Sequence, residues 1–255
     1  MISNYLEILV LSIVQGISEF LPVSSSAHLI IFSNIINFSN KSIILDVGLH
    51  LGSLLAIIFY FKKELLNIKN DKKLFNLLLI GSIPLFFIGY IFYSTGIINS
   101  FRNLKIIAWT TLIFGLLMYF SDTFKTKKRI KNDLTIKNIL IIGIMQILAI
   151  IPGVSRSGIT ITAARFLNFD RHDSTKISFY LSIPALMGAS VLTLKDALNK
   201  NIEFNFLLII SIILSFIFSY LTIKYFLIYT KKFSLKFFVI YRIALSIIIF
   251  FIIYN

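Results

Sequence analysis

The sequence predicts an all-α polytopic membrane protein with about six full transmembrane helices and two re-entrant helix hairpins in inverted-topology repeats. Hydrophobic residues make up 57% of the 255 residues, whereas soluble domains hold roughly 45 to 50%. Apolar runs of about 15 to 25 residues, the length needed to cross or nearly cross a bilayer, recur from one end to the other. Polar residues gather instead in two short stretches, called islands below, around Glu19–His28 and around Ser155–Ser157. We expect a single integral membrane domain over residues 1–255.

The apolar stretches define the elements in order, because length is more informative than periodicity where isoleucine and phenylalanine occupy nearly every helix face. They cover residues 2–17, 22–36, 43–61, 74–93, 105–120, 136–151, 157–168, 177–194, 205–229 and 236–254. Four of them are short for a hydrocarbon core about 30 Å thick, at a rise of about 1.5 Å per residue. We therefore predict that 2–17 pairs with 22–36, and 136–151 with 157–168, as re-entrant hairpins. Six full spans remain.

Three compositional features exclude whole classes of function. The absence of cysteine excludes a disulfide framework, a thiolate nucleophile and a cysteine-ligated metal. The first apolar run has no basic flank and no small-residue cleavage site after it, so we expect it in the mature protein rather than in a signal peptide. The net charge of +14 lies in short loops between apolar runs, so it indicates lipid orientation and no nucleic-acid partner.

The two polar islands repeat each other at a constant offset. At an offset of 131 residues the matches are Gln15 with Gln146, Val23 with Val154, Ser24 with Ser155, Ser26 with Ser157, Asn37 with Asn168 and Phe38 with Phe169. An offset near half the chain length indicates duplication, with repeat one at about 1–120 and repeat two at about 132–255. The alternative is chance matching in a chain of low complexity.

The uneven distribution of lysine and arginine among the loops predicts how these repeats are oriented in the membrane. The loops at 62–73, 121–137, 165–176 and 224–236 hold 18 of the 25 lysines and arginines, which predicts that they are cytoplasmic. Three full spans, an odd number, separate the hairpins, so the first hairpin enters from the outer face and the second from the cytoplasmic face. Opposed broken helices of this kind meet near the midplane around a shared cavity. We expect the resulting site to open to the outer side.

The first island is a cluster of chemically active side chains. Glu19, Ser24, Ser25, Ser26 and His28 supply a carboxylate, three hydroxyls and an imidazole within the first hairpin. An unsatisfied polar group in hydrocarbon costs several kcal/mol, so such residues are functional candidates by default. The alternative for the serines is packing or hydrogen bonding between helices.

The second island favours anion binding. Pro152 and Gly153 break the helix, Ser155 is a predicted N-cap, and Arg156 offers a planar fork of donors suited to bidentate phosphate binding. Free backbone N–H groups at the restarted helix add to this preference. The alternative for Arg156 is a structural ion pair with Glu19 or another carboxylate.

The two islands resemble the signature motifs of a known family. Gln15-Gly-Ile-Ser-Glu19 followed by Phe-Leu-Pro-Val-Ser-Ser, together with Pro152-Gly-Val-Ser-Arg-Ser-Gly-Ile-Thr160, resemble those of the undecaprenyl-diphosphate phosphatases, also called bacitracin resistance proteins. The resemblance extends to Tyr241-Arg242. It implies a multi-pass enzyme of the bacterial inner membrane that removes the terminal phosphate of undecaprenyl diphosphate and so recycles the lipid carrier for peptidoglycan synthesis. Because bacitracin sequesters the same lipid, the resemblance also implies competition with that antibiotic and resistance to it.

The resemblance also implies roles for individual residues. Catalytic roles fall on Glu19, Ser25, His28 and Arg156, and a divalent cation, Mg²⁺ or Ca²⁺, falls on Glu19 with Gln15. Because residue 15 is glutamine, only one carboxylate is present, which weakens the case for a paired-carboxylate metal site. The residues expected to bind the substrate phosphate are Ser24, Ser26, Ser155, Ser157, Gly153 and Thr160.

The sequence leaves several alternatives open. Either Ser25 attacks phosphorus while His28, three residues on and on the same helical face, takes its proton, or a water activated by His28 or Glu19 attacks directly. His50 departs from the family pattern and is either a hydrogen-bonded histidine at a helix interface or a contact to the lipid diphosphate. The rival function is an isoprenoid-lipid transporter or flippase that uses the same midplane site. Chain-length preference and oligomeric state, including a homodimer, are not fixed by the sequence.

Overall fold

A computed structural model describes residues 2–35, 43–66, 72–199 and 206–254. These residues form helices joined by short turns, with one isolated bridge between Lys128 and Phe169. The predicted all-α class is therefore confirmed. The predicted repeat matches Asn37 and Phe38 lie outside the described residues.

The helices follow the apolar stretches of the sequence closely. In chain order they are α1 (Ile2–Ser18), α2 (Ser25–Ile35), α3 (Ile43–Tyr60), α4 (Lys62–Leu66), α5 (Lys72–Thr95), η2 (Ile97–Phe101), α6 (Leu104–Asp122), α7 (Ile130–Asp133), α8 (Ile136–Gln146), η3 (Ile147–Ile150), α9 (Arg156–Phe166), α10 (Arg171–Asn199), α11 (Phe206–Lys232) and α12 (Lys236–Tyr254). The short helices α4, η2 and α7 occupy segments predicted as loops.

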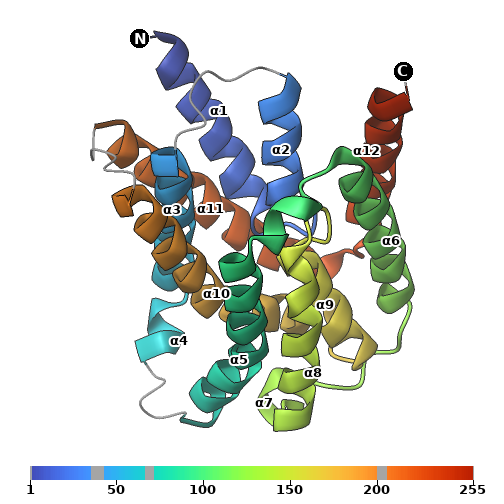
Figure 1. Ribbon diagram of the computed structural model, residues 1–255. Coiled ribbons are helices and arrows are strands. Elements are labelled where there is room, and N and C mark those ends of the chain that lie inside the picture. The colour runs from blue at the N-terminus through green and yellow to red at the C-terminus, as the bar shows by residue number, and fades with distance from the viewer. Residues whose placement is uncertain (1, 36–42, 67–71, 200–205, 255) are drawn as a thin grey trace.

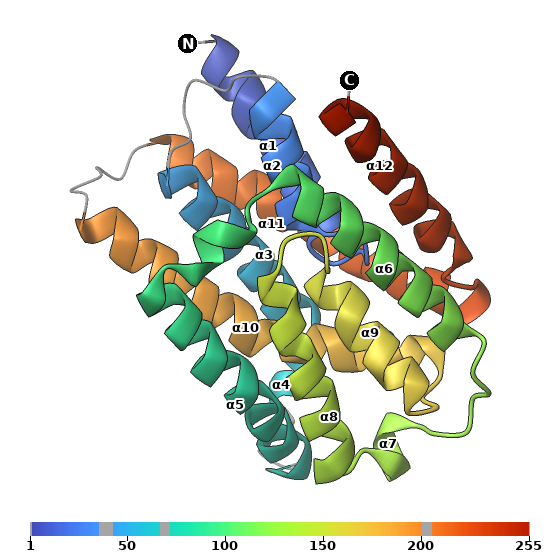
Figure 2. The ribbon, with the colours of Figure 1, turned by 45° about the vertical axis from the view of Figure 1, so that its right-hand side comes forward.

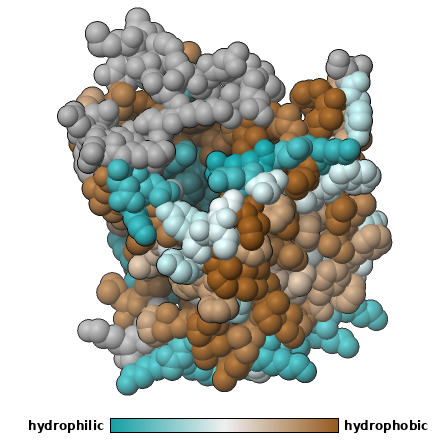
Figure 3. Space-filling model, in the orientation of Figure 1, coloured by the Kyte–Doolittle hydropathy of each residue, from teal (hydrophilic) through white to brown (hydrophobic). Residues whose placement is uncertain are grey.

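Five of the described helices are long and apolar enough to cross a membrane, namely α5, α6, α10, α11 and α12. The predicted sixth span corresponds to α3, whose apolar part within the described residues is shorter, at Leu45–Tyr60. The surface agrees with a lipid environment, because apolar side chains cover the middle of the molecule while polar ones gather at its lower end and in a band above (Figure 3). Large apolar side chains such as Phe87, Ile240 and Phe251 are more than 60% exposed.

The two predicted hairpins are present and oppose each other. The pairs α1–α2 and α8–α9 enter from opposite ends of the molecule, and their turns meet near its centre (Figures 1 and 2). Helices α6 and α12 pack together beside these turns, and α3 packs against α10 and α11 on the other side. This arrangement places both polar islands inside the helix bundle.

Close helix contacts hold this frame together. A Cβ atom at Gly48 would lie 2.0 Å from Ser211 Oγ, so α3 and α11 approach each other only because glycine stands there. The largest apolar core surrounds Phe20, Phe61 and Phe179, and the Phe20 and Phe179 rings meet edge to face at 5.4 Å. Phe20 adjoins the first polar island, so the core fixes one side of the candidate site.

Candidate active site

Both hairpin turns use the same backbone device. Ser24 and Ser155, which are 131 positions apart, have left-handed φ angles of 76° and 70°. Each hydroxyl accepts a hydrogen bond from the backbone N–H three residues later, at 3.4 Å from Ala27 and 3.1 Å from Gly158. The predicted N-cap role of Ser155 is thus confirmed. A non-glycine residue in this conformation costs about 1 to 3 kcal/mol and is common at functional sites.

The two turns contact each other directly. Gly153 N donates to Ser24 Oγ at 3.2 Å, and Ser157 Oγ donates to Leu21 O at 2.8 Å. Gly153 has a φ of 91°, and a Cβ there would lie 2.1 Å from Thr110 Oγ1, so only glycine fits. The tips of the two hairpins therefore form one structural unit.

Arg242 joins both turns to α6. Its side chain is 0% exposed. It donates to the carbonyl oxygens of Gly153 at 2.8 Å, Val154 at 3.1 Å, Thr111 at 3.2 Å and Pro22 at 3.3 Å. Among the described residues it has no carboxylate partner, so backbone carbonyls alone stabilise its charge.

Glu19 lies at the centre of the joined turns. Its Oε1 accepts from Arg156 Nη2 at 2.9 Å. Its Oε2 accepts from Ser25 Oγ at 2.7 Å and from Gln15 Nε2 at 3.1 Å. The side chains of Glu19 and Arg156 are only 9% and 12% exposed, so the pair is largely shielded from water. The ion pair considered for Arg156 is present, and it joins the first hairpin to the second.

His28 makes its hydrogen bonds to groups other than Ser25. Its Nδ1 lies 2.7 Å from Ser24 O, and its Nε2 lies 2.6 Å from Tyr241 Oη. Because a carbonyl only accepts, Nδ1 carries the proton, and the neutral ring therefore accepts from Tyr241 at Nε2. The His28 and Tyr241 rings also stack, with centroids 5.8 Å apart.

The structure gives Ser25 and His28 separate hydrogen-bond partners, so proton transfer between them stays a prediction. Helix α2 begins at Ser25 directly after the left-handed Ser24, and this start turns the Ser25 hydroxyl back across the turn to Glu19. The His28 ring instead binds the carbonyl one helical turn earlier. The group positioned to take the Ser25 proton is therefore Glu19.

The remaining predicted residues lie in or next to these turns. Ser26 contacts Ser24 at 3.3 Å, and Ser155 contacts Ser157 at 3.2 Å. Thr160 donates to Ser178 Oγ on α10 at 2.7 Å, a contact between helices. Their roles in phosphate binding stay predictions.

His50 lies on α3 and is hydrogen-bonded. Its Nδ1 is 2.8 Å from Asp46 O within the same helix. This contact agrees with the structural alternative, except that the partner belongs to its own helix instead of a neighbouring one. Its contact with a lipid diphosphate stays a prediction.

Sequence reasoning missed Tyr241 and Arg242 as parts of the site. Both lie in α12, within the last apolar stretch. A charged side chain inside the membrane costs free energy, so an arginine in an apolar run is by default a functional candidate. The sequence therefore contained a signal for Arg242. The contact between Tyr241 and His28 joins residues 213 positions apart and has no local signature.

The residues around Glu19 fit a hard divalent cation in part. Gln15 Oε1 is buried without a hydrogen-bond partner in the described part of the chain. The other end of this amide, Nε2, donates to the Glu19 carboxylate at 3.1 Å, and amide and carboxylate oxygens are donors that suit Mg²⁺ or Ca²⁺. The described residues contain no group of three His, Cys, Asp or Glu side chains that could complete a shell. Oxygen atoms of substrate and water would have to supply the other ligands.

Comparisons with known proteins agree along the whole chain. The family model described as bacitracin resistance protein BacA matches residues 8–248. The chain is 61% identical to an undecaprenyl-diphosphatase of Pelagibacter ubique over 256 residues, which cover 100% of both proteins. It is 41% identical to the undecaprenyl-diphosphatase of Elusimicrobium minutum over 94% of each protein, and 36% identical to that of Alcanivorax borkumensis over 97% of this chain and 98% of the relative. The chain that folds around the Glu19–Arg156 pair therefore belongs to the bacitracin resistance protein BacA family.

Proposed function

We propose that this membrane enzyme hydrolyses undecaprenyl diphosphate to undecaprenyl phosphate and inorganic phosphate. Membership of the family and the printed name of its relatives support this activity. The product is the lipid carrier of peptidoglycan synthesis, and lowering the amount of the diphosphate form gives bacitracin resistance. The relatives are named for a hydrolase, which favours hydrolysis over transport.

One observation carries the mechanism, namely the 2.7 Å contact of Ser25 Oγ with Glu19 Oε2. Glu19 takes the Ser25 proton while Ser25 Oγ attacks the terminal phosphorus. The bond from that phosphorus to the bridging oxygen breaks. Undecaprenyl phosphate leaves and takes from Glu19 the proton that came from Ser25. Water then hydrolyses the phosphoserine, which restores Ser25 and releases inorganic phosphate.

Arg156 stabilises the phosphoryl group as its negative charge spreads. Its Nη2 donates to the carboxylate and the carbonyl oxygen of Glu19, and its Nη1 donates to Ser178 O, so the Nε–H and the second Nη1 N–H are left for phosphate oxygens. The first N–H groups of α9 add to this binding. The further phosphate contacts in the proposal are Ser24, Ser26, Gly153, Ser155, Ser157 and Thr160.

A divalent cation, Mg²⁺ or Ca²⁺, is part of the proposal. Glu19 and Gln15 would hold it together with phosphate oxygens, as the buried, unpartnered Gln15 Oε1 suggests. When bound, such an ion neutralises negative charge on the diphosphate.

The setting of the enzyme is proposed on the charge bias of its loops. We place it in the bacterial inner membrane with the site facing the outer side, because lysine and arginine concentrate in the loops at 62–73, 121–137, 165–176 and 224–236. Competition with bacitracin for the lipid, homodimer formation and the bounds of the two repeats stay predictions.

The test is phosphate release from a long-chain isoprenyl diphosphate by purified variants in detergent. Ser25→Ala should abolish turnover, and acid-quenched wild-type enzyme should carry a covalent phosphate on Ser25. Ser219→Ala is the matched control, because this buried serine contacts Ser53 outside the site and should remain active.

The same experiment distinguishes the water route. If Ser25 only positions phosphate, Ser25→Ala should keep about a hundredth to a thousandth of the rate, while Glu19→Gln or His28→Ala falls far lower. A Ser25→Ala enzyme with that residual rate and no covalent phosphate in the wild type would refute the serine nucleophile.

A further inference from the structure

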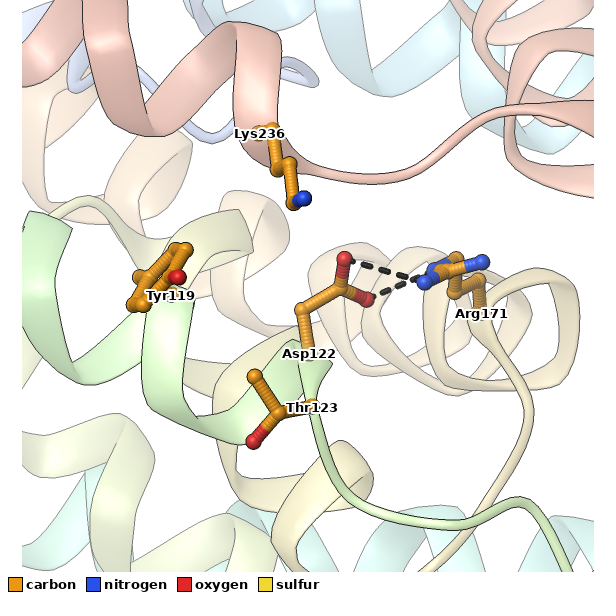
Figure 4. Close-up of a pocket in the computed structure, with 5 residues that line it drawn as sticks. All are labelled: Tyr119, Asp122, Thr123, Arg171 and Lys236. Atoms are coloured by element: carbon orange, nitrogen blue, oxygen red, sulfur yellow. Dashed lines mark hydrogen bonds and ion pairs between the residues drawn. The ribbon is translucent and has the colours of Figure 1, made fainter.

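A polar pocket lies away from the candidate active site. It has a volume of about 210 Å³ and forms where the end of α6 meets the first turns of α10 and α12 (Figure 4). Tyr119 and Asp122 line it from α6, Thr123 from the residue that follows α6, Arg171 from α10 and Lys236 from α12. Its walls adjoin loops that the charge bias predicts to be cytoplasmic.

The pocket has a surplus of positive charge. Arg171 binds Asp122 through Nε at 2.6 Å and Nη2 at 3.1 Å. Buried Arg165 also lies against this carboxylate, with Nε 3.6 Å from Oδ1. Lys236 has neither a hydrogen-bond nor an ion-pair partner among the described residues. Positive charge thus exceeds negative charge at the pocket, and a bound anion would reduce this excess.

The free donors in the pocket suit phosphate oxygens. The Lys236 ammonium points toward the Asp122–Arg171 pair (Figure 4). The Asp122 carboxylate is already saturated, because it also accepts from Leu235 N at 3.1 Å. The Tyr119 hydroxyl has no hydrogen-bond partner within the described ranges. An ammonium, the outer edge of a guanidinium and a phenol together form strong charge-assisted contacts with phosphate.

Exposed apolar residues next to two of the lining residues in the chain favour a lipid over a free ion. Phe120 and Phe237, the chain neighbours of Tyr119 and Lys236, are 57% and 64% exposed. Basic pockets between transmembrane helices at the cytoplasmic surface recognise anionic head groups. We propose that this pocket binds the phosphate-bearing headgroup of an anionic phospholipid, with the acyl chains against α6 and α12.

The test measures lipid binding to the full-length protein and needs no substrate. Purified protein in detergent is titrated with phosphatidylglycerol, phosphatidylcholine or inorganic phosphate, and retained lipid is counted by native mass spectrometry alongside the thermal unfolding midpoint. Lys236→Gln is the main variant, because Lys236 has no partner to lose, whereas Arg171 holds Asp122. Tyr119→Phe is the second variant. Lys232→Gln, an exposed lysine in the last turn of α11 outside the pocket, is the matched control.

We expect the wild type to retain phosphatidylglycerol in preference to phosphatidylcholine. Lys236→Gln should weaken that binding about fivefold, the effect of one basic residue near an anionic surface, while Lys232→Gln binds as the wild type does. Equal retention of the two lipids, or an equal loss in both lysine variants, would overturn the proposal. A thermal shift with inorganic phosphate as large as with phosphatidylglycerol, and lost in Lys236→Gln, would assign the pocket to free phosphate and overturn the lipid.

Discussion

Replacing Arg242 by methionine tests whether this residue holds the active-site turns together. Methionine keeps an unbranched apolar side chain and removes every N–H donor of the guanidinium. Of the four carbonyls that Arg242 binds, those of Pro22, Gly153 and Val154 belong to the turns. A hydrogen bond inside a membrane protein is worth about 0.6 kcal/mol on average and about 1.7 kcal/mol at most, so losing all four should lower the free energy of unfolding by about 2 to 7 kcal/mol. The lower end is expected, because removing a buried cation relieves part of its desolvation cost.

The rate of phosphate release by Arg242→Met should fall by more than its loss of folded protein explains. Released turns shift Ser25 against Glu19, and a displacement of about 1 Å costs about a hundredfold in rate. The assays are detergent-induced unfolding in bicelles and phosphate release. Ser246→Ala is the control, since it removes one bond between α12 and Ala108 O on α6, 2.8 Å long, without touching the turns. Wild-type stability and turnover in Arg242→Met, or an equal loss of turnover in Ser246→Ala, would refute the reasoning.

Three further predictions concern chemistry and orientation. Arg156→Lys should fold but lose most activity in the phosphate-release assay, because a point charge cannot reproduce bidentate contact; near-normal turnover would reduce Arg156 to a counter-ion of Glu19. Dialysis against a chelator should abolish turnover, with recovery on adding Mg²⁺ or Ca²⁺, and full activity without metal would contradict the cation proposal. In this cysteine-free chain, an impermeant maleimide applied from outside should label Ser100→Cys in η2 and spare Lys125→Cys, and the reverse pattern would invert the proposed orientation.

The sequence was a good guide where local rules decide the structure. Segment length predicted both hairpins, and the helix break at Pro152 and Gly153 predicted the Ser155 cap. The ion pair of Arg156 with Glu19 was one of two stated alternatives, because a buried charge in hydrocarbon needs a partner.

The partner of Ser25 depends on geometry that spacing alone does not give. A separation of three residues places Ser25 and His28 on one helical face only where both lie inside the helix, and Ser25 is its first residue. The left-handed Ser24 before it sends the hydroxyl to Glu19 instead. The position of Arg242 in an apolar run marked it as a candidate, but its partners are backbone carbonyls, which the sequence pattern does not identify.

The buried ion pair at the centre of the enzyme is divided between the two hairpins. Glu19 comes from the one that enters at one end of the molecule, and Arg156 from the one that enters at the other. Either charge left alone in hydrocarbon costs several kcal/mol, so neither hairpin settles at full depth before its counterpart arrives. The Glu19–Arg156 pair therefore makes each hairpin depend on the other for the stability of its buried charge.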